Sequence, residues 1–121
     1  MNIENTLRRF RLIADLDNIE AEKWSDLVIE SREYLESIVI KDEIFELDEK
    51  RLDNAAAVYA YYRYVCYTAS NESSFTAGDL KVSFNSKKIS SAKEMWEREF
   101  NCIRDIVDDN NSAFLFKRVV Y

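Results

Sequence analysis

The chain has 121 residues and a formal net charge of −6, with no proline, one glycine and no histidine. This length predicts a single domain, residues 1–121, that can bury a core without disulfides or a metal. The missing histidine removes the commonest general base and metal ligand, one glycine excludes the usual phosphate-binding loops, and the acidic balance argues against sequence-specific nucleic-acid binding, so we expect no catalytic residue, no metal site, no cofactor and no enzyme.

The first predicted helix covers residues 3–14. Apolar side chains recur there at helical spacing, and Arg8, Arg9 and Arg11 lie on the other side. This basic face is either simply solvated or a docking face for an acidic partner. Residues 21–40 predict a second helix, whose apolar residues form one stripe. Four carboxylates fall outside this stripe: Asp26, Glu30, Glu33 and Glu36.

Acidic side chains are concentrated in residues 15–53. This stretch holds fourteen acidic and five basic residues, a net charge of −9, against +2 for residues 1–14 and +1 for residues 54–121. Solvated helix faces explain the excess without any function; the alternative is a surface that repels a polyanion. A polar break precedes the third helix, which is the central helix of the fold and which we expect to begin between residues 48 and 53.

Residues 55–69 are predicted to form the central helix. Every position is apolar or aromatic except Arg63 and Thr68, so this helix has no polar face and must be covered by the rest of its own protein. The run is shorter than a membrane span of about 20 residues and carries a charge. We therefore expect no membrane partner.

Residues 70–88 are predicted to form a long protruding loop that contains a strand. Serine, asparagine and the single glycine cluster there, and Leu80, Val82 and Phe84 alternate with polar residues as in a strand. One strand has no ladder of its own, so its edge needs a partner from this chain or from a neighbour.

The last helix is predicted from the capping-box spacing of Ser91 and Glu94, and we expect it to end near residues 108–111. Residues 112–121 are rich in β-branched and aromatic side chains and predict an extended C-terminal arm that is tied down somewhere. The expected fold is thus all-α or mostly α because helix breakers are scarce: a small bundle of about four helices, with the strand-like loop between the last two and this arm at the end.

Two short runs resemble a known family. They are GDLKVS at residues 78–83 and SAKEMWER at residues 91–98. The runs and the order of the elements resemble the head-tail connector proteins of tailed bacteriophages, also called adaptor or head-completion proteins. Leu80 stands where that family usually has a valine.

The resemblance implies a structural virion protein at the head-tail junction, assembled in the cytoplasm of a bacterial host. Copies would form a ring of about a dozen beneath the phage portal protein, extend the DNA channel and join the capsid to a tail-side neck or stopper protein. The loop and the arm carry the candidate subunit or portal interface: Phe75, Gly78, Leu80, Val82, Phe84, Phe114, Phe116, Val119 and Tyr121. The four carboxylates of residues 26–36 would face the channel, where they repel passing DNA.

Two other classes of function remain open at this point. One is a small helical regulatory or adaptor module that binds a partner protein through its loop and C-terminal arm, as a monomer or dimer. The other is an enzyme that works with acidic residues alone. Carboxylates gathered on one wall of the bundle favour the connector, since an adaptor needs no such asymmetry.

Overall fold

The computed structural model describes residues 3–75 and 79–107, apart from the side chains of residues 70–85. Five helices make up the fold: α1 (Ile3–Ala14), α2 (Asn18–Lys23), α3 (Ser25–Ser37), α4 (Glu46–Phe75) and α5 (Asp79–Cys102). The described part contains no strand, and its one isolated β-bridge pairs Val39 with Val107 in antiparallel fashion. The predicted all-α helical bundle is confirmed.

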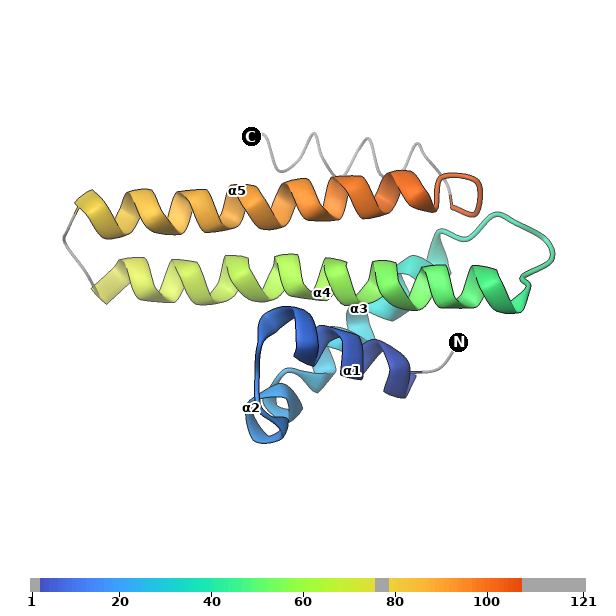
Figure 1. The fold of residues 1–121 in the computed structure, drawn as a ribbon, viewed down its shortest axis with the longest axis horizontal. Helices are drawn as coiled ribbons and strands as arrows, with labels where there is room; N and C mark the ends of the chain where they lie inside the picture. Colours follow the sequence, from blue (N-terminus) through green and yellow to red (C-terminus); the bar gives the residue numbers. More distant parts are fainter. Residues whose placement is uncertain (1–2, 76–78, 108–121) are drawn as a thin grey trace.

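The two longest helices form the frame of the molecule. Figure 1 shows α4 and α5 side by side as a long antiparallel hairpin, with α1–α3 packed against the other side of α4. The end of the hairpin that carries the α4–α5 connection extends beyond α1–α3. Because α4 contacts α1, α3 and α5, it is the central helix that the run of apolar residues predicts.

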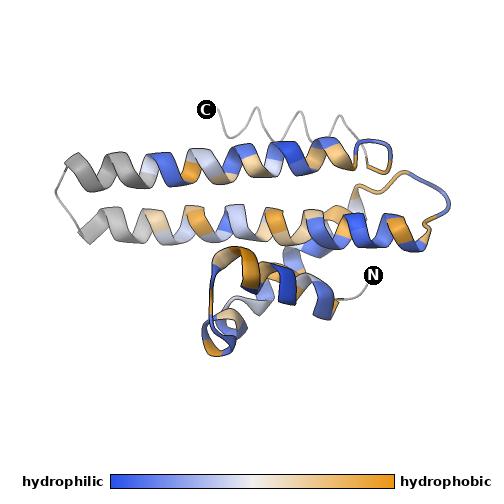
Figure 2. Ribbon diagram, in the orientation of Figure 1, coloured by the Kyte–Doolittle hydropathy of each residue, from blue (hydrophilic) through white to orange (hydrophobic). Residues whose placement is uncertain are grey.

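Alanines allow the three neighbours to approach α4 closely. Ala55, Ala56, Ala57 and Ala60 have no exposed surface, and a side chain this small lets helix backbones pack near one another. One apolar cluster joins α4 to α5 and α3. A second cluster joins α4 to α1 and α3, around Phe10. Figure 2 shows the resulting alternation of hydrophobic and hydrophilic residues along α4 and α5.

The second predicted helix is divided in two by Trp24. This residue ends α2 and begins α3, with φ −103° and ψ 10°. The side chain of Asp17 accepts a hydrogen bond from the backbone N–H of Glu20 at 2.8 Å, which starts α2 three residues before the predicted boundary. This division explains why the structure has five helices rather than about four.

The predicted loop and strand at residues 70–88 are wrong. Residues 70–75 belong to α4 and residues 79–88 belong to α5. Leu80 and Phe84 are four residues apart, as on one helical face, so Val82 alone produced the apparent alternation. No proline interrupts either helix.

The predicted limits of the last helix are also wrong. Ser91 lies in the interior of α5 rather than at its N-terminus, so the capping-box spacing had no structural meaning. The helix ends at Cys102, because Ile106 and Val107 donate backbone hydrogen bonds to the carbonyl of Ile103 at 2.9 and 3.1 Å and turn the chain towards Val39. The predicted arm at residues 112–121 lies outside the described residues.

Candidate interaction surface

Four of the nine interface residues predicted from the sequence lie in the described part of the chain, at one end of the hairpin. Phe75 is the last residue of α4, while Leu80, Val82 and Phe84 lie in the first turns of α5. The antiparallel hairpin therefore brings them to its projecting end as helical residues rather than as a strand (Figure 1). The remaining nominated residues, Gly78, Phe114, Phe116, Val119 and Tyr121, lie outside the described part of the chain.

The four nominated carboxylates form an exposed stripe on α3, which we call the acidic stripe: Asp26, Glu30, Glu33 and Glu36. Their spacing of four, three and three residues keeps them on one side of the helix. Arg63 approaches Glu30 at 3.3 Å and Arg32 approaches Glu36 at 3.4 Å. Neither Asp26 nor Glu33 has an ion-pair partner among the described residues, so no neighbouring cation offsets their negative charges.

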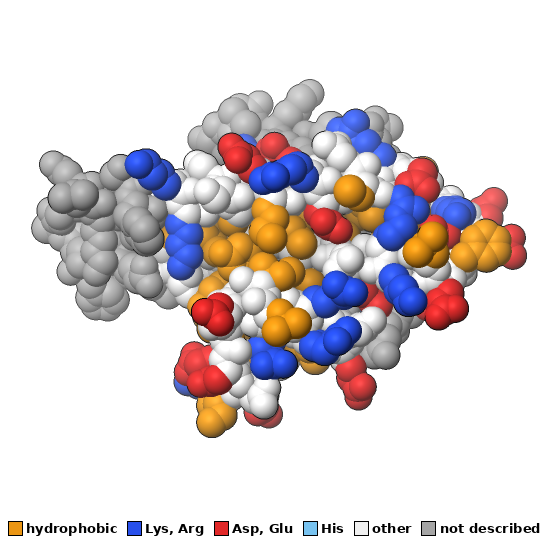
Figure 3. Space-filling model, viewed as in Figure 1, with side chains coloured by type: hydrophobic (Ala, Val, Ile, Leu, Met, Phe, Trp, Pro, Cys, Tyr) orange, Lys and Arg blue, Asp and Glu red, His pale blue; other side chains and the backbone are white. Residues whose placement is uncertain are grey.

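A second surface, which we call the corner, is formed by residues 40–47, the last part of the α3–α4 connection and the first two residues of α4. Ile40, Phe45 and Leu47 are 62%, 56% and 69% exposed there. Asp42, Glu43 and Glu46 are exposed between them. Figure 3 shows hydrophobic and acidic side chains together at this end of the molecule. The ribbon also shows hydrophobic residues on both sides of a hydrophilic turn (Figure 2).

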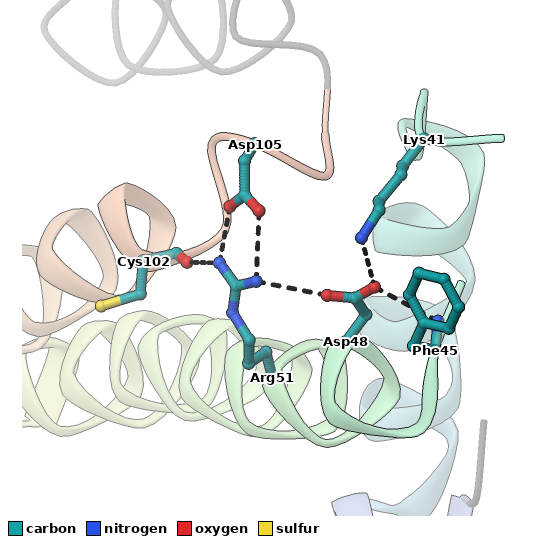
Figure 4. Close-up of polar contacts among 6 residues, drawn as sticks. All are labelled: Lys41, Phe45, Asp48, Arg51, Cys102 and Asp105. Atoms are coloured by element: carbon teal, nitrogen blue, oxygen red, sulfur yellow. Dashed lines mark hydrogen bonds and ion pairs between the residues drawn. The ribbon is translucent and has the colours of Figure 1, made fainter. Parts of the chain in front are cut away.

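A network of charged side chains, which we call the clasp, fixes the corner in place (Figure 4). Asp48 accepts hydrogen bonds from Lys41 Nζ at 2.6 Å, from the backbone N–H of Phe45 at 3.2 Å and from Arg51 at 3.3 Å. Arg51 also binds both carboxylate oxygens of Asp105, at 2.6 and 3.2 Å. The same guanidinium donates to the backbone carbonyl of Cys102. The clasp therefore connects the corner, the start of α4 and the end of α5.

The bond between Asp48 and Phe45 is half of a capping box. Phe45 is the residue before the first helical position of α4, and its carbonyl accepts the first helical hydrogen bond, from Glu49, at 3.0 Å. Asp48 occupies the third helical position, from which a carboxylate can reach back to the N–H of the preceding cap residue. Its negative charge also lies at the positive end of the helix dipole.

Hydrogen bonds in the clasp favour the charged carboxylates. The hydrogen bond from Lys41, followed by that from the Phe45 N–H, lowers the pKa of Asp48 below its usual value. The pKa of Asp105 is lowered as well, chiefly by the hydrogen bond from Arg51. Both carboxylates of the clasp are therefore ionised at neutral pH.

The clasp holds Phe45 in position without burying it. Lys41 Nζ lies 5.1 Å from the centre of the Phe45 ring, within the range of a cation–π contact. The ring nevertheless remains more than half exposed. An exposed aromatic side chain whose backbone is already held is suited to anchor a partner, because little further ordering is required on binding.

A third surface is a groove of about 230 Å³ between α1 and α2, which we call the basic groove. Leu7, Arg8 and Arg11 line it from α1, and Ala21 and Glu22 line it from α2. Arg8 is exposed and donates a hydrogen bond to Asn5 at 2.9 Å. The two arginines give the groove a positive balance.

The corner was not predicted, because its residues lie in a polar break that reads as a simple connection between two helices. The signal was present: Ile40, Ile44, Phe45 and Leu47 are large apolar residues among acids, outside both neighbouring helical stripes. Nothing local indicated that Arg51 would reach Asp105, because 54 positions separate the two residues.

Among the described residues, no group of three or more cysteine, aspartate or glutamate side chains could hold a metal ion. No described helix is long and apolar enough to cross a membrane. The features that remain are the three surfaces: acidic stripe, corner and basic groove.

Searches with the whole chain matched no protein-family model, no curated protein and no solved structure.

Proposed function

We propose that this chain is a structural virion protein, the head-tail connector of a tailed bacteriophage. It assembles in the cytoplasm of the bacterial host and stays at the head-tail junction. A ring of about a dozen copies lies beneath the portal protein, extends the DNA channel and offers a platform to a tail-side neck or stopper protein. Its work is mechanical and requires no active site.

The observation that carries this proposal is the projecting hairpin. With 30 and 24 residues, α4 and α5 are about 45 Å and 36 Å long at 1.5 Å per residue. Helices α1–α3 pack beside only part of this length, and the end of the hairpin that carries the α4–α5 connection extends beyond them (Figure 1). Residues 79–83 of the GDLKVS run, on which the connector resemblance depends, lie in the first turns of α5 at this end. A projecting hairpin can reach a neighbouring ring while the rest of the protein stays compact.

The acidic stripe supports the same function. A channel that passes DNA benefits from a wall that does not attract phosphate, since like charges repel over about a Debye length, ~8 Å at physiological salt. All four carboxylates of the stripe are exposed on one side of α3. An adaptor that binds one partner protein has no need of such a wall.

Portal binding tests the proposed function. The full chain is mixed with portal rings from the same genome, sedimented, and imaged by negative staining. The proposal predicts cosedimentation and an added ring of density beneath the portal. A chain that neither sediments with the portal nor changes its image would contradict the connector and favour the small adaptor module.

A charge-reversal variant tests the role of the acidic stripe. Glu33→Lys reverses a charge that has no ion-pair partner among the described residues, and Glu94→Lys is the matched reversal on an exposed position of α5. We expect only Glu33→Lys to make the assembled ring retain DNA at low salt, because it places a cation in the channel. Equal retention of DNA by the two variants would contradict the proposal that the stripe lines the channel.

A further inference from the structure

The corner is an exposed apolar surface with an acidic surround. Its three large apolar side chains are exposed together, and Asp42, Glu43 and Glu46 flank them. Lys41, the one basic residue of the corner, is held by Asp48 at 2.6 Å. A partner for this surface therefore needs an apolar recess with basic side chains at its edge.

The basic groove has that complementary chemistry. Leu7 and Ala21 contribute apolar lining, and the two arginines, Arg8 and Arg11, outnumber the one acidic lining residue, Glu22. Two further aliphatic residues of the same helices, Leu12 and Ile19, are 64% and 72% exposed. Basic side chains gather over α1 on the face that Figure 3 shows. The groove thus offers an apolar surface for the apolar side chains of the corner and positive charges for its acidic side chains.

The two surfaces cannot meet within one copy. The corner lies at the end of the molecule where α4 begins, whereas α2 lies beneath the middle of the hairpin (Figure 1). Contact between them therefore requires a second molecule.

We propose that the corner of one copy docks into the basic groove of the next copy, with Phe45 and Leu47 as the apolar anchors and Arg8 and Arg11 facing the acidic residues of the corner. Such a contact joins two different surfaces, so each copy keeps one of each free for the next neighbour. Heterologous contacts of this kind close into a ring or continue as a filament. The inference rests on the proposed function for the expectation of a ring, and it names the contact between neighbouring copies.

The test uses one variant on each surface. Leu47→Asp places a charge at the most exposed apolar side chain of the corner, and Arg8→Glu reverses an exposed charge of the groove. Matched controls on α5 are Ser91→Asp and Arg98→Glu, which make the same changes of charge at exposed positions of another surface. Far-UV circular dichroism checks that each variant is folded. Sedimentation velocity over a range of concentrations then measures assembly.

The expected results are specific to a heterologous contact. Each surface variant alone should be monomeric where the wild type and the controls assemble, with an apparent dissociation constant raised about tenfold or more. An equimolar mixture of Leu47→Asp and Arg8→Glu should form a one-to-one dimer and nothing larger. The first variant keeps an intact groove and the second keeps an intact corner, so one contact is restored.

Several results would overturn the contact. Wild-type rings that persist in both variants would show that another surface joins the copies, while the ring itself would leave the connector function standing. A mixture that stays monomeric would exclude this pairing of surfaces. A wild type that remains monomeric up to about 1 mM would also reject it, because a contact that weak could not hold neighbouring copies together; portal binding would then decide the proposed function separately.

Discussion

Trp96 is fully buried between α5 and α4. Its replacement by alanine should lower the unfolding free energy far more than its replacement by phenylalanine. Its ring centre lies 4.8 Å from that of Tyr59 and 5.6 Å from that of Phe100. The indole Nε1–H has no hydrogen-bond acceptor among the described residues. The side chain therefore contributes packing but also carries a buried polar group without a partner.

These two contributions set the magnitudes. Trp96→Ala removes the whole side chain and should cost about 3–5 kcal/mol of unfolding free energy. Trp96→Phe loses about 1–2 kcal/mol of burial and packing. It also removes an N–H group whose burial without a partner costs about 1–3 kcal/mol. We therefore expect Trp96→Phe to lie between about 1 kcal/mol less stable and about 2 kcal/mol more stable than the wild type.

Urea unfolding followed by far-UV circular dichroism measures both changes. Phe10→Leu is a useful control, because Phe10 is equally buried but has no polar atom, so its truncation should cost about 1–2 kcal/mol without any relief. A cost above about 3 kcal/mol for Trp96→Phe would refute the reasoning, since it would mean that the indole N–H makes a favourable hydrogen bond.

Two further predictions concern carboxyl groups with shifted pKa values. The pKa of Asp105 is lowered by Arg51, so its contribution is present above the unfolded value of 3.8 and is lost as the pH falls through the folded value. The melting temperature of Asp105→Asn should consequently fall less steeply below pH 3.8 than that of the wild type, and parallel curves would contradict the bidentate pair. The pKa of Glu99 is raised, chiefly by burial and against the attraction of Arg9, so its charge opposes folding above the unfolded value of 4.5. Glu99→Gln should raise the melting temperature at neutral pH and lose this advantage below pH 4.5, whereas a lower melting temperature at pH 7 would show that the charge is well paired.

Local patterns were sufficient to predict the helices that have one clear apolar stripe or no polar face at all. The bounds of α1 agree with the predicted residues 3–14, because a basic face opposite an apolar face defines both the helix and the side of it that is buried. The central helix was recognisable from its lack of any polar face, and it is covered by α1, α3 and α5. The exposure of the acidic stripe followed from the same helical periodicity.

Elements that depend on distant contacts could not be predicted in this way. The path of the chain after α5 is held by backbone hydrogen bonds from Ile40 and Lys41 to the carbonyl of Ile106, at 2.8 and 3.3 Å, between segments far apart in the sequence. Likewise, the corner is held by Arg51 and Asp105 across 54 positions. At residues 80–84, the alternation of apolar residues competed with a weak helical spacing. With no proline nearby and a long neighbouring helix to pack against, the helix is favoured.

Native mass spectrometry of the purified wild-type chain, over a wide range of concentrations, tests the central claim most directly. The account predicts a closed ring of about a dozen identical copies, because a heterologous contact passes from each copy to the next until it returns to the first. A tight dimer that never grows larger at any concentration would contradict it, since a dimer satisfies one self-complementary surface and leaves no contact from which to build a ring.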